Sequence, residues 1–255
     1  MSAVRAVATA CGLILAWQAL VWLTDVPAFI LPGPLAVGRA LADNAGLLVL
    51  HARITLVEIL FGIALGAIIG AATAILLALS PRARLWLTPL LVISQALPVF
   101  ALAPLLVLWL GYGMASKVAM AVLIIYFPVT AAFLDGLRRT DPGWLDLARS
   151  MDASPTAVLR HVRVPAALPA FASGLRVAAA VAPIGAVVGE WVGSSAGLGY
   201  LMLHANARMQ VDLMFAALAV LAVIGLLLWT AADHGGRALA RWQPEALGPH
   251  PGGLD

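Results

Sequence analysis

The carboxylates inside apolar runs are the side chains of this sequence best placed to do chemistry. Glu58 and Glu190 each lie near one end of a long hydrophobic stretch, and few other ionisable groups share their depth. A carboxylate is costly to bury in such a run, so it often marks a transport path or a gate. The alternative is an edge position, hydrated or paired with Arg53 or His51. We favour that alternative for Glu58 and leave both interpretations open for Glu190.

Aromatic residues and a proline accompany Glu190 as candidates. Trp191 follows it directly, and Pro104 and Trp109 lie in an earlier apolar run. Proline removes a backbone donor and favours a kink, which suits a helix that lines a path or moves. Aromatic rings gather at membrane interfaces, and they also stack on flat solutes. We therefore take Glu190, Trp191, Pro104 and Trp109 as candidate pathway or gate residues.

Several other chemistries have no support in the sequence. The five histidines are scattered, and the single cysteine, Cys11, has no partner for a disulfide or a cysteine-based metal site. No Ser/His or paired-Asp site lies within the apolar runs, which argues against an enzyme. The chain also lacks a Gly-x-x-x-x-Gly-Lys-Ser/Thr loop, so it does not bind ATP in that way. We expect no metal and no cofactor in this chain.

The composition places these residues in a membrane. Of 255 residues, 63% are hydrophobic and 11% are charged, whereas soluble domains have roughly 25% charged residues. An integral membrane protein is therefore predicted. The net charge of +3 does not indicate a nucleic-acid partner, because the arginines sit beside apolar runs, where such charges set membrane topology.

Six apolar runs must position the candidate residues, each long enough to cross a bilayer with ~20 residues. They cover about 6–23, 54–79, 85–110, 118–134, 171–192 and 213–232. No small-x-small cleavage pattern follows the first run, so we interpret it as a retained helix. With both termini in the cytoplasm, eleven of the fifteen basic residues fall on the inner side, as the positive-inside rule requires. Residues 1–242 are predicted to form one domain, and 243–255 a disordered tail.

Small residues and prolines give these runs further features. Gly62, Gly66 and Gly70 follow at four-residue spacing, which makes a smooth stripe on one helix face. In lipid such a stripe lets another backbone approach closely. We expect a helix-packing role, within the chain or against a partner subunit. The prolines that interrupt the third to fifth runs are Pro98, Pro104, Pro128 and Pro183.

A polar island interrupts the apolar sequence between Asp135 and Pro169. It holds five of the fifteen basic residues, and hydrophobic runs flank it on both sides. In the predicted orientation the island is cytoplasmic. A structured, basic segment between spans offers a surface to a cytoplasmic partner. The alternative is an amphipathic loop that lies on the lipid headgroups.

The island predicts two short helices. Asp141-Pro142 and Ser154-Pro155 each combine an N-cap acceptor with proline at the first helical position. Apolar residues at i, i+3, i+4 and i+7 from Trp144 give the first helix one apolar face. Pro165 is expected to end the second helix, because proline disfavours helix in the residue before it.

These residues resemble the EAA loop of the membrane subunits of binding-protein-dependent ABC importers. That family has Glu-Ala-Ala, three residues, Gly-Ala, and Leu-Pro about eleven residues later, and the spacing here matches as far as Pro165. Asp146 stands where the family has glutamate, Leu147 where it has alanine and Asp152 where it has glycine. Glycine suits a left-handed turn between the helices, and aspartate tolerates it at a cost of ~1 kcal/mol. The resemblance implies an ATPase-coupling role for Asp146, Ala148, Asp152, Ala153, Ser154 and Pro165.

The resemblance extends over nearly the whole chain. ILPGPLAVGRAL, SQALPVFALAPLLVLWLGYGMASK and GEWVGSSAGLGYLM are similar to permeases for nitrate, alkanesulfonates, taurine and thiamine-precursor pyrimidines. Within that branch, ALAPLLVLWLGYG, VAPIGAVVGEW and MLHANARMQ are most similar to permeases for hydroxymethylpyrimidine-type precursors. The implied fold is an all-α integral membrane protein of the type I ABC importer permease class. It has about six transmembrane helices and a cytoplasmic coupling loop at 135–170, and it lies in a bacterial inner membrane.

The resemblance also implies partners. Two cytoplasmic ATPase subunits would bind ATP and Mg, a periplasmic binding protein would deliver the solute, and a second copy of the permease would complete a homodimer in the lipid bilayer. No nucleic acid is expected. Sulfonate, taurine or nitrate import is the alternative within this class. A secondary transporter is the alternative outside it, and the scarcity of Asp, Glu, His and Lys at the centre of the spans argues against proton coupling.

Overall fold

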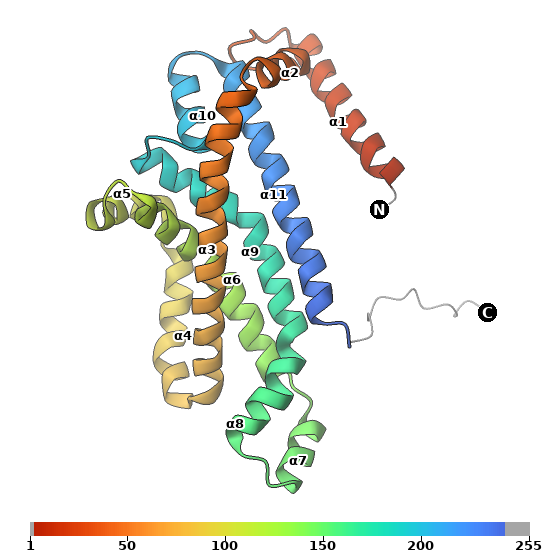
Figure 1. The fold of residues 1–255 in the computed structure, drawn as a ribbon, viewed down its shortest axis with the longest axis vertical. Coiled ribbons are helices and arrows are strands. Elements are labelled where there is room, and N and C mark those ends of the chain that lie inside the picture. The colour runs from red at the N-terminus through yellow and green to blue at the C-terminus, as the bar shows by residue number, and fades with distance from the viewer. Residues whose placement is uncertain (1–2, 243–255) are drawn as a thin grey trace, which may run out of the picture.

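The computed structural model describes residues 3–242, so the predicted tail, 243–255, lies outside the described residues. The described part consists of helices and short connections, without a strand. Four long helices form a central bundle (Figure 1). These are α3 (Ala45–Leu79), α6 (Met114–Arg138), α9 (Val164–Gly193) and α11 (Val211–Leu239).

The helices are long and apolar enough to confirm a multi-pass membrane protein. Five of them meet that description, or six spans if one bent pair is counted. The first, α1 (Ala3–Thr24), stands apart from the bundle in Figure 1, and its contact with α11 includes Trp17 and Phe215, whose rings lie 5.9 Å apart. The short helices α2 (Pro34–Asp43) and α10 (Leu198–Ala207) lie together at one end of the bundle, at the top of Figure 1. We call this the α10 end.

The predicted third span, 85–110, is wrong as a single helix. The chain forms α4 (Pro81–Ala96) and α5 (Val99–Leu110), whose axes differ by 103°. The break falls where Leu97 precedes Pro98, and Leu97 is extended with ψ 125°. A residue before proline disfavours helix, which explains this position. By contrast, α5, α6 and α9 continue through Pro104, Pro128 and Pro183.

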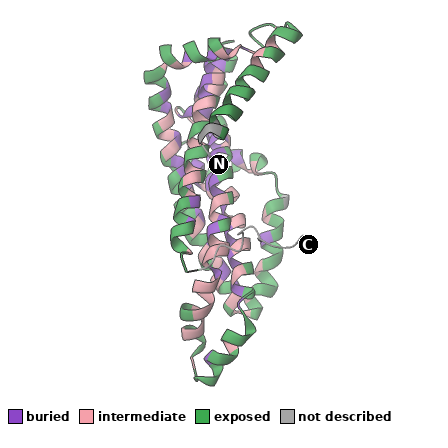
Figure 2. Cartoon of the chain, turned by 90° about the vertical axis from the view of Figure 1, so that its right-hand side faces the viewer, coloured by how far each residue is buried: buried purple, intermediate pink, exposed green. Residues whose placement is uncertain are grey.

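The glycine stripe packs on α6 of the same chain. A Cβ atom added to Gly62 would lie 2.5 Å from the Ala121 Cβ, and one on Gly66 would lie 2.6 Å from Ile125. A Cβ atom added to Gly70 would lie 3.1 Å from the Thr130 Oγ1. The stripe is therefore a contact between neighbouring spans, and a partner subunit is not needed to cover it. Figure 2 shows buried residues along the middle of the bundle, where α6 lies between α3 and α9.

The island forms α7 (Pro142–Ser150), α8 (Pro155–Val158) and a π-helical turn, Leu159–Arg163. Both predicted starts are confirmed. Asp141 accepts a hydrogen bond from Gly143 N at 2.7 Å, and Ser154 accepts one from Ala157 N at 3.2 Å. The loop projects from the end of the bundle opposite α10 (Figure 1). We call that end the loop end.

The prediction that Pro165 ends the second helix is wrong. Helix continues from Pro155 to Gly193 through the π-helical turn. Proline lacks an N–H and its ring displaces the carbonyl four residues earlier. The turn before it is wider, with Val164 N bonded to Leu159 O five residues back. This widening accommodates the proline without ending the helix.

Candidate functional site

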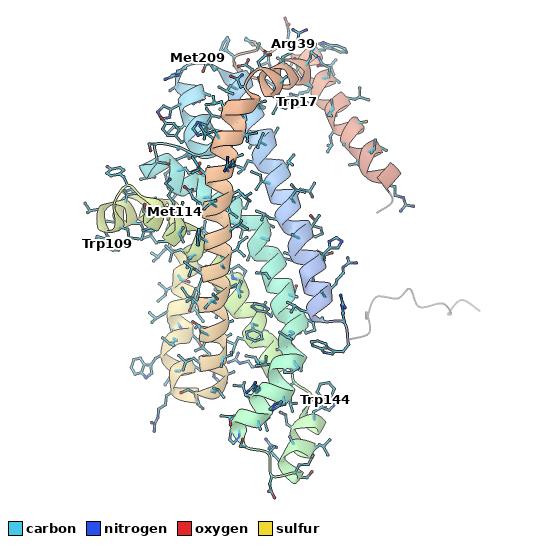
Figure 3. The ribbon with its side chains drawn as sticks, viewed as in Figure 1. Trp17, Arg39, Trp109, Met114, Trp144 and Met209 are labelled. Carbon is cyan, nitrogen blue, oxygen red and sulfur yellow. The ribbon has the colours of Figure 1, made fainter. Side chains whose placement is uncertain are left out.

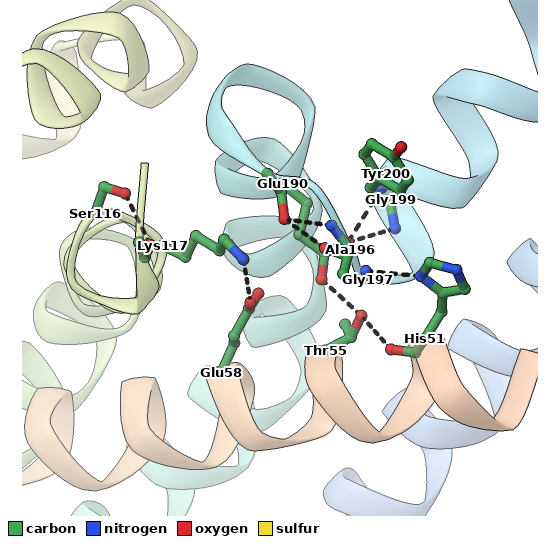
Figure 4. Close-up of polar contacts among 12 residues, drawn as sticks. His51, Thr55, Glu58, Ser116, Lys117, Glu190, Ala196, Gly197, Gly199 and Tyr200 are labelled. Carbon is green, nitrogen blue, oxygen red and sulfur yellow. Dashed lines mark hydrogen bonds and ion pairs between the residues drawn. The ribbon is translucent and has the colours of Figure 1, made fainter. Parts of the chain in front are cut away.

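Five buried side chains form a polar cluster toward the α10 end (Figure 4). His51, Thr55 and Glu58 come from α3, Lys117 from α6 and Glu190 from α9. None is more than 8% exposed. The α3 members are spaced i, i+4 and i+7, so they share one helix face. This buried polar cluster links four helices, because α10 also contributes backbone groups to it.

Glu58 and Lys117 form a buried ion pair. The Glu58 Oε1 and Lys117 Nζ atoms are 2.7 Å apart. The prediction of a hydrated Glu58, or one paired with Arg53 or His51, is therefore wrong. Lys117 lies in the first turn of α6, and its side chain is buried in the bundle. A buried charge needs a compensating partner, and here the partner is 59 residues away, so no local sequence pattern reveals it.

Glu190, on α9, caps the N-terminus of the neighbouring helix α10. Its carboxylate accepts hydrogen bonds from Gly199 N at 2.5 Å, Tyr200 N at 3.3 Å and the Thr55 hydroxyl at 2.6 Å. The first N–H groups of a helix have no partner within it, and a negative charge there is favourable. Glu190 thus stabilises α10, a helix that the sequence-based spans did not include.

Two residues of α3 complete the same set of contacts. Thr55 Oγ1 accepts from Leu198 N at 2.8 Å, and His51 Nδ1 accepts from Gly197 N at 2.9 Å. Four consecutive backbone N–H groups, 197–200, therefore bind side chains of the cluster. The connection between α9 and α10 is consequently fixed to α3.

Gly197 is required by this arrangement. Its φ angle is +117°, a conformation that side chains rarely adopt. A Cβ atom there would also lie 2.2 Å from the Glu190 Cδ. The close approach of the backbone to the carboxylate thus depends on the missing side chain.

The other pathway candidates lie away from the Glu190 carboxylate. Trp191 is 41% exposed, and its ring meets Phe100 edge-on at 6.4 Å. Trp109 is 70% exposed (Figure 3), and Pro104 is exposed on the same helix, α5. The structure places Glu190 in the cluster and leaves the other three on open faces of the single chain.

The turn between α7 and α8 has the geometry that the sequence pattern predicts. Asp152 has φ +52°, in the left-handed region. Asp152 N bonds to Arg149 O and Ala153 N to Ala148 O, each at 3.0 Å. These are the two bonds of a Schellman motif, in which the left-handed position is usually glycine. Aspartate therefore adopts the conformation expected for the family's glycine.

The remaining coupling candidates surround that turn. Asp146 pairs with Arg149 at 2.8 Å, but both side chains are about 70% exposed. Ser154 caps α8, and Pro165 lies in the first turn of α9. The apolar face of α7 is open as well: Trp144, Leu147 and Met151 are 56%, 61% and 74% exposed. These three residues and Pro165 line a groove of about 760 Å³, which we call the docking groove.

Asp233 is a further polar residue that the sequence analysis missed. It is 6% exposed and forms ion pairs with Arg176 at 2.8 Å and Arg237 at 2.9 Å. The pair with Arg176 connects α9 to α11. Arg237 lies four residues along the same helix, so this half of the contact follows the i, i+4 rule.

The bundle is apolar enough to span a membrane, and its capped two-helix loop projects from one end. The chain belongs to the family described as the inner membrane component of binding-protein-dependent transport systems, which matches residues 62–242. The match includes the α7–α8 loop and two of the five side chains of the buried polar cluster, Lys117 and Glu190. Together with this family match, the bundle and its loop make the chain a permease-type membrane subunit and not an enzyme.

Relatives match over most of their length. A probable ABC transporter permease protein of Haemophilus influenzae is 61% identical over 87% of this chain and 90% of its own. The riboflavin transport system permease protein RibX of Chloroflexus aurantiacus is 40% identical, covering 91% and 87%. The formylaminopyrimidine transport permease protein ThiX of Halalkalibacterium halodurans is 35% identical, covering 91% and 92%.

The fold is that of type I ABC importer permeases. The MetNI methionine ABC transporter, in an inward-facing conformation, matches with a TM-score of 0.66 and 21% identity. The match covers 77% of this chain and 98% of the other. The predicted fold class is therefore confirmed.

Proposed function

We propose that this chain forms the translocation path of an ATP-driven importer for a small nitrogen heteroaromatic solute, with a thiamine-precursor pyrimidine as the leading substrate. Two relatives that match most of the chain are named for transport of formylaminopyrimidine and riboflavin. Riboflavin is the second candidate, on the 40% identity of RibX. The pyrimidine is placed first because ALAPLLVLWLGYG, VAPIGAVVGEW and MLHANARMQ are most similar to permeases for such precursors. A sulfonate, taurine or nitrate substrate is the alternative within the same class.

The projecting loop is the observation that carries the importer mechanism. It combines a fixed turn with an exposed apolar face on α7, beyond the end of the bundle. Exposed apolar patches mark interaction sites. The proposed occupants are two cytoplasmic ATPases, one on the loop of each permease copy. The ATPases would bind ATP and Mg, and this chain would need no cofactor.

The loop end is then the cytoplasmic end. It carries Arg138, Arg139, Arg149, Arg160 and Arg163, in agreement with the positive-inside rule. The α10 end would face the periplasm and receive the binding protein. Both termini would be cytoplasmic in the bacterial inner membrane.

The open faces of α5 and α9 are the proposed path. Trp109, Trp191 and Pro104 are exposed in the single chain, and a second copy would enclose them. Aromatic rings suit a flat heterocycle, because offset stacking adds to the area buried. Glu190 would act differently: it holds the α9–α10 connection next to Trp191, and so positions the path instead of touching the solute.

Reconstitution tests the proposal. The chain is placed in liposomes with its ATPase and binding protein, and uptake of labelled hydroxymethylpyrimidine, riboflavin and taurine is compared. We expect ATP-dependent uptake of the pyrimidine. Uptake of taurine alone would contradict the substrate class. Uptake by this chain alone, driven by an ion gradient, would contradict the importer mechanism and favour a secondary transporter.

A further inference from the structure

A second groove at the loop end lies between the start of α4 and the end of α6. Its volume is about 460 Å³, and it is separate from both the docking groove and the proposed path. The residues that line it are Pro81, Arg84, Leu85, Thr88, Pro89 and Arg138. Arg84 and Arg138 come from different helices and are brought together only by the fold.

The charge of this groove favours an anion. Both arginine side chains are exposed, and neither forms an ion pair with any residue that the structure describes. No acidic residue is among those that line the groove. Guanidinium groups match the geometry of phosphate oxygens, so two of them lining one groove from different helices suit a phosphate group.

Neutral polar groups lie beside the arginines. Thr88 contributes a hydroxyl group, and Pro89 has no N–H to bond the Leu85 carbonyl one turn earlier. The groove therefore offers a hydrogen-bond acceptor as well as donors. A phosphate that carries a hydroxylated substituent, such as glycerol, satisfies both.

Beside the arginines, α4 exposes apolar side chains, of which Leu85 lines the groove. Leu85 and Trp86 are 73% and 74% exposed, and Leu90 farther along α4 is 59% exposed. Tryptophan is typical of the interface between headgroups and acyl chains. A free phosphate would use only the polar part of this surface, whereas a phospholipid would use both parts.

We propose that this groove binds the headgroup of an anionic phospholipid, with the phosphate between Arg84 and Arg138 and the acyl chains along α4. Basic pockets between spanning helices bind such headgroups. With the loop end in the cytoplasm, the lipid would belong to the inner leaflet. Because α4 leads directly to α5, an ordered lipid here would also fix one side of the proposed path.

Lipid titration of the full chain in neutral detergent tests this site. Phosphatidylglycerol, phosphatidylcholine and glycerol 3-phosphate are added separately, and bound lipid is counted by native mass spectrometry while Tm is recorded. The groove variant is Arg84→Gln with Arg138→Gln. The matched control, Arg39→Gln with Arg208→Gln, removes two exposed arginines at the α10 end.

We expect phosphatidylglycerol to bind and raise Tm, and the groove variant to bind it at least about tenfold more weakly. The control variant should bind as the parent does. Equal binding by the groove variant would overturn the proposal, as would an equal response to phosphatidylcholine. An equal response to glycerol 3-phosphate would identify a soluble-anion site and overturn the lipid assignment.

A second variant, Arg84→Lys with Arg138→Lys, keeps the charge and should bind with intermediate affinity. Binding as weak as that of the glutamine variant would also count against a charge-based headgroup site.

Discussion

The buried polar cluster and the α7–α8 loop both depend on a residue with positive φ beside a short helix: one precedes α10, and the other follows α7. In the cluster it is Gly197, at φ +117°, and in the loop it is Asp152, at φ +52°. Gly197 has no room for a Cβ, whereas the Asp152 side chain is exposed. One turn is determined by contacts within the chain, and the other leaves its side chains free for another molecule.

The two regions also differ in how much their ion pairs contribute to stability. The cluster contains a buried ion pair, and loss of one partner leaves an unpaired charge, which is expensive. The ion pair of the loop is about 70% exposed on both sides, and such pairs contribute little. Changes in the cluster should therefore affect folding, and changes in the loop should affect coupling.

The largest effect is expected for Lys117→Met, which leaves Glu58 buried without its partner. Stability should fall by about 3–5 kcal/mol. Replacing both residues, as Glu58→Leu with Lys117→Met, should recover most of that loss. Denaturation in detergent, followed by circular dichroism, measures both variants. If Lys117→Met alone is as stable as the parent, the ion pair does not contribute to folding.

Gly197→Ala should come next. The substitution combines an unfavourable φ with a clash against Glu190, for a loss of roughly 2–4 kcal/mol. Gly46→Ala is the control, because a Cβ there meets nothing within 4 Å. It should leave Tm unchanged or raise it slightly. If Gly197→Ala and Gly46→Ala have the same Tm, the α9–α10 connection does not depend on Gly197 in the way described.

A smaller change of opposite sign is expected for Asp152→Gly. Glycine adopts the left-handed conformation without a Cβ penalty, so stability should rise by up to ~1 kcal/mol. Binding of the ATPase should persist, because the turn keeps its shape. A decrease in Tm would mean that the aspartate side chain makes a contact that outweighs its backbone cost.

The smallest effect is predicted for Arg149→Ala, which removes the exposed ion pair with Asp146. No resolvable change in Tm is expected. Any loss of uptake in this variant would then report contact with a partner and not instability. A clear fall in Tm would show that the loop is held by its own contacts, and would remove the contrast with the cluster.

Local rules predicted the loop well. The two N-caps depend on residues within a few positions of one another, and the left-handed turn was implied by the resemblance to the EAA loop. The glycine stripe was also predicted, because its four-residue spacing is a property of one helix. Pro165 was misjudged because a widened turn accommodates it.

Long-range contacts explain what the sequence could not provide. Lys117 meets Glu58 across 59 positions, and His51 meets Gly197 across 146. Pairing at such distances depends on how α3, α6 and α9 pack, and no pattern within one helix encodes it. The short helix α10 was missed for a related reason, since its first turn is stabilised by side chains of α3 and α9.

The most direct test compares one variant from each region in the same two assays. Asp152→Arg with Ala153→Trp alters the loop turn, and Gly197→Ala alters the cluster. Tm of the purified chain is measured, together with the amount of ATPase that co-purifies from the assembled transporter. We predict that the loop variant unfolds with a stability within about 1 kcal/mol of the parent but no longer co-purifies with the ATPase. Gly197→Ala should have a lower Tm than the parent. Normal co-purification and uptake by the loop variant would contradict the claim that this turn is the ATPase contact.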